Sequence, residues 1–179
     1  KSKLISYGSC TVNAYVPFAA WIHKNYGIVD SDVNVIHNIQ EYRMKDNSTL
    51  NRKFCTLEKS AKLLMDPIND DNFIVNYTVI PYTGVSMIDF RFKTKKLVDR
   101  LTLINDLEEA INDGELSNLY GLDEIDIGPE IHNCTIFSTV FIKEGIKTLN
   151  GNLFFQGYFD NENSVNRFYD LADYISQVS

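Results

Sequence analysis

The sequence predicts an α/β fold of the α+β type, in which a mixed, largely antiparallel β-sheet is covered by helices. Segments rich in β-branched and aromatic residues, with period-two alternation, gather in the middle and last third of the chain. Segments with apolar residues at helical spacing stand at both ends. No strict strand-helix-strand repeat occurs, so an all-parallel sheet is not expected.

Length and composition predict one domain over residues 1–179, because a chain of 179 residues with 44% hydrophobic content can bury a substantial core. The 17 Lys and Arg against 24 Asp and Glu give a net charge of −7, which opposes binding to nucleic acid. No apolar run approaches the roughly 20 residues of a membrane span. Three cysteines without CxxC spacing indicate neither disulfides nor zinc, and we expect a cytoplasmic protein.

The first predicted helix starts with Thr11 as N-cap and ends at Gly27, which suits a left-handed C-terminal position. One face of this helix is apolar, and it consists of Val12, Tyr15, Val16, Ala19, Ile22 and Tyr26.

The other elements follow from periodicity and from turn residues. Further helices are predicted at 57–65, 95–112 and from 164 onward. Strands are predicted at 32–39, 73–80, 85–92, 135–143 and 153–159. Pro81-Tyr82-Thr83-Gly84 predicts a hairpin between the second and third of these strands, and Asn150-Gly151 predicts another before the last one.

No complete catalytic motif stands in the sequence. It has no GxSxG elbow and no GxxxxGK[ST] or GxGxxG loop, so no catalytic or metal-binding residue is assigned. Cys10 precedes a helix whose dipole favours a thiolate, yet we interpret it as a buried structural cysteine. We interpret His23 and His132 as structural too, and His37 as a strand-end histidine bonded to backbone groups, although it could point toward a cleft near Arg43.

Asp89 is a lone carboxylate between apolar strand residues. Alternation places it on the solvent face together with Arg91 and Lys93, where a charge contact on that face explains it.

Five segments, in order along the chain, resemble the C-terminal half of the chloramphenicol-acetyltransferase-like acyltransferases, which include alcohol acetyltransferases and condensation domains. These segments are Cys10 to Lys24, Val33 to Arg43, Gly84 to Phe90, Ser117-Asn118 with Gly121, and Gly151 to Tyr158. The family's catalytic HxxxD motif is absent from the sequence.

The resemblance implies half of a two-subdomain fold that forms one wall of a substrate tunnel in an acyl-CoA-dependent O- or N-acyltransferase. It implies substrate-binding roles for Ser117, Asn118, Asp89 and Phe90. The partner would be an N-terminal catalytic half of the same protein, acting on a small alcohol or amine. Acetyl-CoA or another acyl-CoA would be the co-substrate, with no covalently bound cofactor. The alternative is a non-catalytic protein-binding or scaffold module with the same half-fold.

Overall fold

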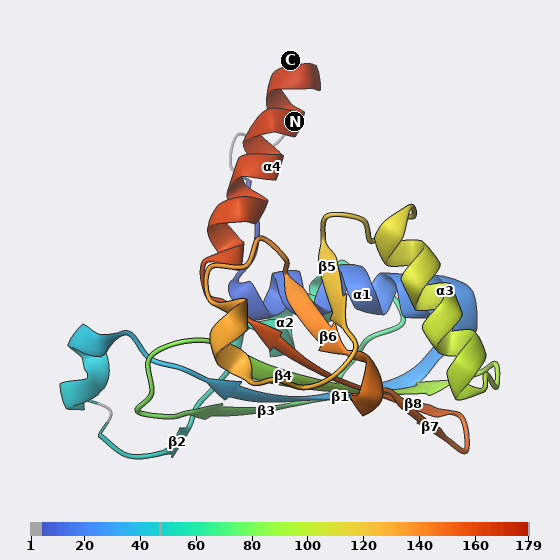
Figure 1. The fold of residues 1–179 in the computed structure, drawn as a ribbon, viewed down its shortest axis with the longest axis horizontal. Coiled ribbons are helices and arrows are strands. Elements are labelled where there is room, and N and C mark those ends of the chain that lie inside the picture. Colours follow the sequence, from blue (N-terminus) through green and yellow to red (C-terminus); the bar gives the residue numbers. More distant parts are fainter. Residues whose placement is uncertain (1–4, 47, 179) are drawn as a thin grey trace.

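A mixed sheet forms the centre of the computed structural model, which describes residues 5–46 and 48–178 (Figure 1). Its strands are β1 (Ile28–His37), β2 (Asn51–Arg52), β3 (Phe73–Val79), β4 (Ser86–Thr94), β5 (Tyr120–Asp123), β6 (Thr139–Ile142), β7 (Lys147–Leu149) and β8 (Asn152–Phe159). Their order is β2-β3-β1-β4-β8-β6-β5, with β7 paired to β8. Within the described residues β1·β3 and β5·β6 are parallel and the other pairs antiparallel, which confirms the predicted fold class.

The α-helices are α1 (Cys10–Tyr26), α2 (Thr56–Leu64), α3 (Arg100–Asn112) and α4 (Asn163–Val178). Short 3-10 turns are η1 (Glu41–Asp46), η2 (Pro129–His132) and η3 (Lys143–Gly145). Figure 1 shows α1 lying along the sheet, α3 beside β5, and α4 projecting from the body of the molecule. No helix in the described part of the chain is long and apolar enough to cross a membrane.

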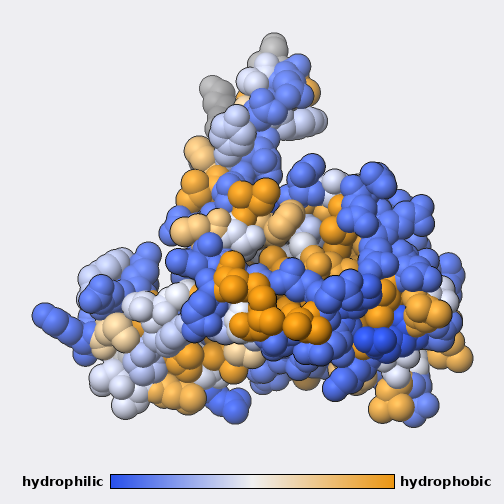
Figure 2. All heavy atoms as spheres, viewed as in Figure 1, coloured by the Kyte–Doolittle hydropathy of each residue, from blue (hydrophilic) through white to orange (hydrophobic). Residues whose placement is uncertain are grey.

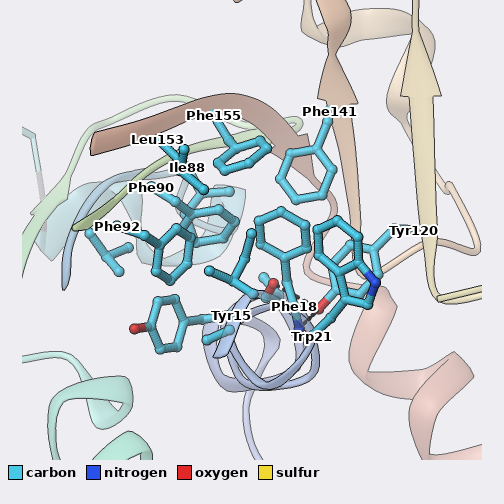
Figure 3. Packing of buried hydrophobic residues seen from close by; sticks show 14 of the residues in the cluster. Tyr15, Phe18, Trp21, Ile88, Phe90, Phe92, Tyr120, Phe141, Leu153 and Phe155 are labelled. Carbon is cyan, nitrogen blue, oxygen red and sulfur yellow. Dashed lines mark hydrogen bonds between the residues drawn. The ribbon is translucent and has the colours of Figure 1, made fainter. Parts of the chain in front are cut away.

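The main core lies between α1 and the central strands. Phe18 of α1 is fully buried, and its ring packs against Phe90, Phe141 and Phe155 at centroid distances of 5.8, 4.4 and 4.8 Å (Figure 3). These three rings come from β4, β6 and β8, so one helical side chain joins three strands. Burying a phenylalanine ring stabilises a fold by about 2 kcal/mol or more. The Phe18 contacts are therefore an important part of the packing of α1 against the sheet.

The Tyr120 hydroxyl supplies hydrogen bonds to backbone groups of α1 near Pro17, where the helix lacks one of its own. Pro17 has no N–H to donate to the carbonyl of Asn13, four residues earlier. The Tyr120 hydroxyl lies 3.2 Å from the Asn13 oxygen and 3.0 Å from the Ala14 oxygen, and it accepts the Phe18 N–H at 3.0 Å (Figure 3). A buried backbone group without a hydrogen-bond partner lowers the stability of the fold. The Tyr120 hydroxyl therefore stabilises the packing of β5 against α1 at Pro17.

The predicted alternation of β4 is confirmed. Phe90 is 2% exposed and faces the core, whereas Asp89, Arg91 and Lys93 lie on the opposite face of the sheet. There Arg91 pairs with the carboxylates of Asp30 and Asp32 on the neighbouring strand β1. The charge contact predicted for Asp89 is not found among the described residues, and its Oδ1 has no hydrogen-bond partner there. Burial raises the pKa of Asp89 above its usual value, because its partly desolvated carboxylate disfavours the charged form.

The hairpin predicted at Pro81 to Gly84 is wrong. β1 lies between β3 and β4, parallel to the first and antiparallel to the second. The connection crosses the end of β1, where the Ile39 N–H donates to the Tyr82 oxygen at 2.9 Å. A parallel pair such as β1 and β3 is joined by a long connection and is not marked by a turn. The sequence therefore predicted that β3 and β4, which follow each other in the chain, are also neighbours in the sheet.

Several element boundaries also differ from the prediction. The cap of α1 is Ser9 and not Thr11, which lies inside the helix. α3 begins five residues later than predicted, because the Asp99 side chain caps it by accepting the Thr102 N–H at 3.0 Å. The apolar face predicted for α4 is mostly exposed, as Phe168 illustrates at 56%. Two short elements, η1 and β2, were not predicted, and residue 47 between them lies outside the described residues.

The hairpin predicted at Asn150-Gly151 is confirmed. β7 and β8 pair antiparallel, with Leu149 opposite Asn152. Both turn residues have positive φ, 50° and 74°, which is the backbone conformation that Asn-Gly hairpin turns require.

Candidate functional site: a cysteine-histidine pair

A thiol and an imidazole meet where α1 begins and β1 ends. Cys10 is the first residue of α1, and His37 is the last residue of β1. The Cys10 Sγ lies 3.4 Å from the His37 Nε2, within hydrogen-bond range for sulfur. A nucleophile beside a base, with the base held by a third group, is the general arrangement of covalent catalysis.

The hydrogen bonds of His37 show which of its two ring nitrogens carries the proton. His37 Nδ1 lies 2.6 Å from the carbonyl oxygen of Asn38. A carbonyl can only accept, so Nδ1 carries the proton and Nε2 of the neutral ring is unprotonated. The Cys10 S–H therefore donates to Nε2, and that nitrogen is placed to take the thiol proton.

Both groups are neutral at physiological pH. Burial raises the pKa of Cys10 to about 11, although backbone N–H groups at the start of α1 oppose this effect. Burial also lowers the pKa of His37 below its usual 6.5, despite the bond to Asn38. A thiol with so high a pKa is a weak nucleophile alone, so its reactivity depends on proton transfer to His37.

Buried polar contacts hold Cys10 in place. The side-chain amide of Asn163, which is fully buried, donates to the carbonyl oxygens of Cys10 and Ser138 at 3.2 and 3.0 Å. The neighbouring Thr11 hydroxyl contacts the Cys55 thiol at 3.4 Å, at the start of α2. The start of α1 is thus joined to the first residue of α4, to the residue before β6 and to the residue before α2.

A cavity of about 340 Å³ opens beside His37. Its lining includes the cationic side chains of Arg43 and Lys53 together with the amides of Asn38 and Asn161. The Asn161 Nδ2 donates to the Asn38 Oδ1 at 2.6 Å, and the Asn161 Oδ1 has no partner among the described residues. The cavity therefore presents positive charge and polar groups beside His37, the partner of Cys10. Within the described residues no group of three His, Cys, Asp or Glu side chains could hold a metal ion.

The four residues predicted to bind substrate lie apart from this pair. Ser117 and Asn118 line a different cavity, between α3, β5 and η2. Phe90 is in the core and Asp89 is on the opposite face of β4. A substrate contact of any of the four stays a prediction.

Comparison with known proteins finds a relative that is named for a different class of enzyme from the one predicted. The chain is 25% identical, over 194 aligned positions, to a Bacillus cereus protein named glyceraldehyde-3-phosphate dehydrogenase 1. The alignment covers 97% of this chain and 56% of that protein, so the chain spans just over half the length of this relative. No protein-family model matches the sequence.

The acyltransferase interpretation is wrong. The similarity runs to a protein named as a dehydrogenase over nearly the whole chain, whereas the acyltransferase resemblance depended on five short, degenerate segments. The alcohol or amine acceptor, the acyl-CoA co-substrate and the N-terminal catalytic half were implied only by that resemblance, and no separate observation bears on them.

Both Cys10 and His37 were singled out in the sequence, but their contact was not predicted. Cys10 was recognised at a helix start and His37 at a strand end near Arg43, but they are 27 residues apart. One signal was available. A helix followed at once by a strand that returns along it brings the first residue of the helix close to the last residue of the strand.

Proposed function

We propose that this chain is the thiol-bearing catalytic part of an aldehyde dehydrogenase in which Cys10 is the nucleophile and His37 its general base. The observation that carries the proposal is the 3.4 Å contact from Cys10 Sγ to the unprotonated His37 Nε2. The name of the Bacillus cereus relative describes a dehydrogenase of a phosphate-bearing aldehyde. Arg43 and Lys53 in the adjoining cavity suit such an anionic substrate.

The chemistry of a thiol with an aldehyde assigns a role to each group. The Cys10 sulfur forms a bond to the carbonyl carbon as the carbonyl π bond breaks, and His37 Nε2 receives the thiol proton. Transfer of that proton to the new alkoxide gives a neutral thiohemiacetal, so atoms and charge balance. His37 is then again unprotonated and is placed to accept the hydroxyl proton of the adduct in a later step.

Oxidation of this adduct requires a hydride acceptor, and the residues present here do not form the usual site for a dinucleotide. The sequence has no GxGxxG loop, and the sheet of the described residues is mostly antiparallel and not doubly wound. We therefore assign to this chain the capture of the aldehyde and the proton transfers at Cys10.

The test is protection of Cys10 from alkylation by an aldehyde. Glyceraldehyde 3-phosphate is expected to slow modification of Cys10 by iodoacetamide in a saturable and reversible way, because the adduct removes the free thiol. Peptide mass spectrometry measures the modification of each cysteine separately. The exposed Cys134 is the internal control and is expected to react at an unchanged rate.

Glycerol 3-phosphate is the matched ligand control, since it keeps the phosphate and lacks the carbonyl. It is expected to protect Cys10 only weakly. Equal protection by both compounds would show that the ligand covers the site without forming a bond, and absence of protection by the aldehyde would overturn the proposal.

A further inference from the structure

A second hollow lies far along the sheet from the cysteine-histidine pair. It has a volume of about 670 Å³ and shares no lining residue with the cavity beside His37. All four residues of β5 line it, together with residues of α3 and of the segment around η2. Figure 2 shows apolar side chains gathered over η2 and the front of β5 and β6, beside the hydrophilic surface of α3.

The hollow extends across the open edge of β5. This strand is the last in the sheet and pairs only with β6 among the described strands. On one face of β5 the lining comes from Glu108 and Ile111 of α3, and on the other face from His132 and Phe137. Side chains from both faces can line one hollow only if it passes around the strand edge. An edge strand presents a row of N–H and C=O groups that another extended chain can bond.

A buried histidine in this hollow lacks a hydrogen-bond partner. The His132 side chain is 5% exposed, and its Nε2 makes no hydrogen bond with any described residue. The nearest carboxylate oxygen, Asp123 Oδ2, lies 3.6 Å away, beyond hydrogen-bond range. The His132 ring is fixed by stacking on Tyr158 at a centroid distance of 5.1 Å. An unpaired buried polar atom is costly, so a ligand group that completes its bonding is favoured.

The charge around the hollow is negative. Glu108, Asp123 and Glu124 line it, and its lining contains no Lys or Arg. Lys143 lies beside it and bonds Glu108 and Glu124 at 2.5 and 2.9 Å. Asp123, at the end of β5, has no Lys or Arg partner among the described residues, and the nearest basic group is the His132 ring at 3.6 Å. A cationic group is the complement of this carboxylate.

We propose that the groove formed by β5, α3 and η2 binds an extended, basic peptide that adds to β5 as a further strand. Main-chain bonds to β5 would supply the affinity, and a lysine or arginine beside Asp123 the specificity. The apolar side chains around η2 would contact the alternate residues of the peptide. This proposal is independent of the chemistry at Cys10.

The probe is a fluorescein-labelled peptide of alternating valine and lysine, and fluorescence anisotropy measures its binding to the protein. Two further peptides of the same length distinguish the contribution of the lysine charge from that of the main-chain hydrogen bonds. One has glutamate in place of lysine. The other keeps the lysines and carries N-methyl groups on alternate amides, which prevents strand addition. Only the unmethylated lysine peptide is expected to bind tightly.

A charge change at the groove locates the site. Asp123→Asn is expected to weaken binding about fivefold, as loss of a partly exposed ion pair does. Asp71→Asn changes the net charge equally at an exposed position outside the groove, and it is expected to leave binding unchanged. Equal binding of the methylated peptide, equal effects of the two substitutions, or no binding of the lysine peptide would each overturn the proposal.

Discussion

Replacement of His37 by glutamine is expected to slow alkylation of Cys10 by iodoacetamide about 10²-fold near neutral pH, the usual contribution of a general base. Burial raises the pKa of Cys10 to about 11, so the thiolate is rare without assistance. His37 Nε2, at 3.4 Å, supplies the acceptor for its proton. Glutamine keeps a polar side chain at the same position but cannot take a proton at this pH. Mass spectrometry of the Cys10 peptide measures the rate.

Two controls distinguish loss of base assistance by His37 from loss of the folded structure. In the same samples the exposed Cys134 is expected to react at the parental rate. His23→Gln removes a histidine that accepts the Ile28 N–H and does not contact Cys10, and it is expected to leave the Cys10 rate unchanged. An unchanged Cys10 rate in folded His37→Gln protein would show that the imidazole does not assist the thiol.

Replacement of Tyr120 by phenylalanine is expected to lower the free energy of unfolding by about 3 kcal/mol, because each buried backbone group left unpaired costs roughly 1–3 kcal/mol. The hydroxyl accepts the Phe18 N–H and donates toward the carbonyl oxygens of Asn13 and Ala14. Phenylalanine fills nearly the same volume and makes none of these bonds. Urea denaturation measures the loss.

A double-mutant cycle with Pro17→Ala tests the cause of that loss. Alanine restores the N–H that the Asn13 carbonyl lacks, and it lets Phe18 bond within the helix. The Tyr120→Phe substitution is then expected to cost about 1 kcal/mol less than in the parent, a typical coupling between contacting groups. Equal costs in both backgrounds would show that the hydroxyl does not compensate for Pro17.

Local patterns predicted much of this fold. The apolar face of α1 contains Tyr15 and Ile22, both fully buried, and Asn150-Gly151 forms the turn between β7 and β8. These features depend on neighbours a few residues apart. The position of β1 between β3 and β4 depends on a parallel pairing that no turn residue marks. The four-residue strand β5 was missed, because it is short and contains Gly121.

The candidate site was harder to predict than the fold. Each member of the pair was visible in the sequence, yet the contact between Cys10 and His37 exists only because β1 returns along α1. The burial that sets both pKa values also comes from distant elements, as the ring contacts of His37 with Tyr77 and Phe159 show. Short motif resemblances could not replace this geometry, and they led to the wrong chemistry.

The pH dependence of Cys10 alkylation tests the central claim most directly, because a thiol assisted by a base and a lone thiol behave differently. A base with a lowered pKa stays unprotonated to lower pH, so the account predicts a nearly constant rate near neutral pH that falls only below the usual histidine value of 6.5. In His37→Gln the constant region is expected to disappear. A parental rate that instead rises about tenfold per pH unit through neutrality, as for an unassisted thiol with a pKa of about 11, would contradict the account.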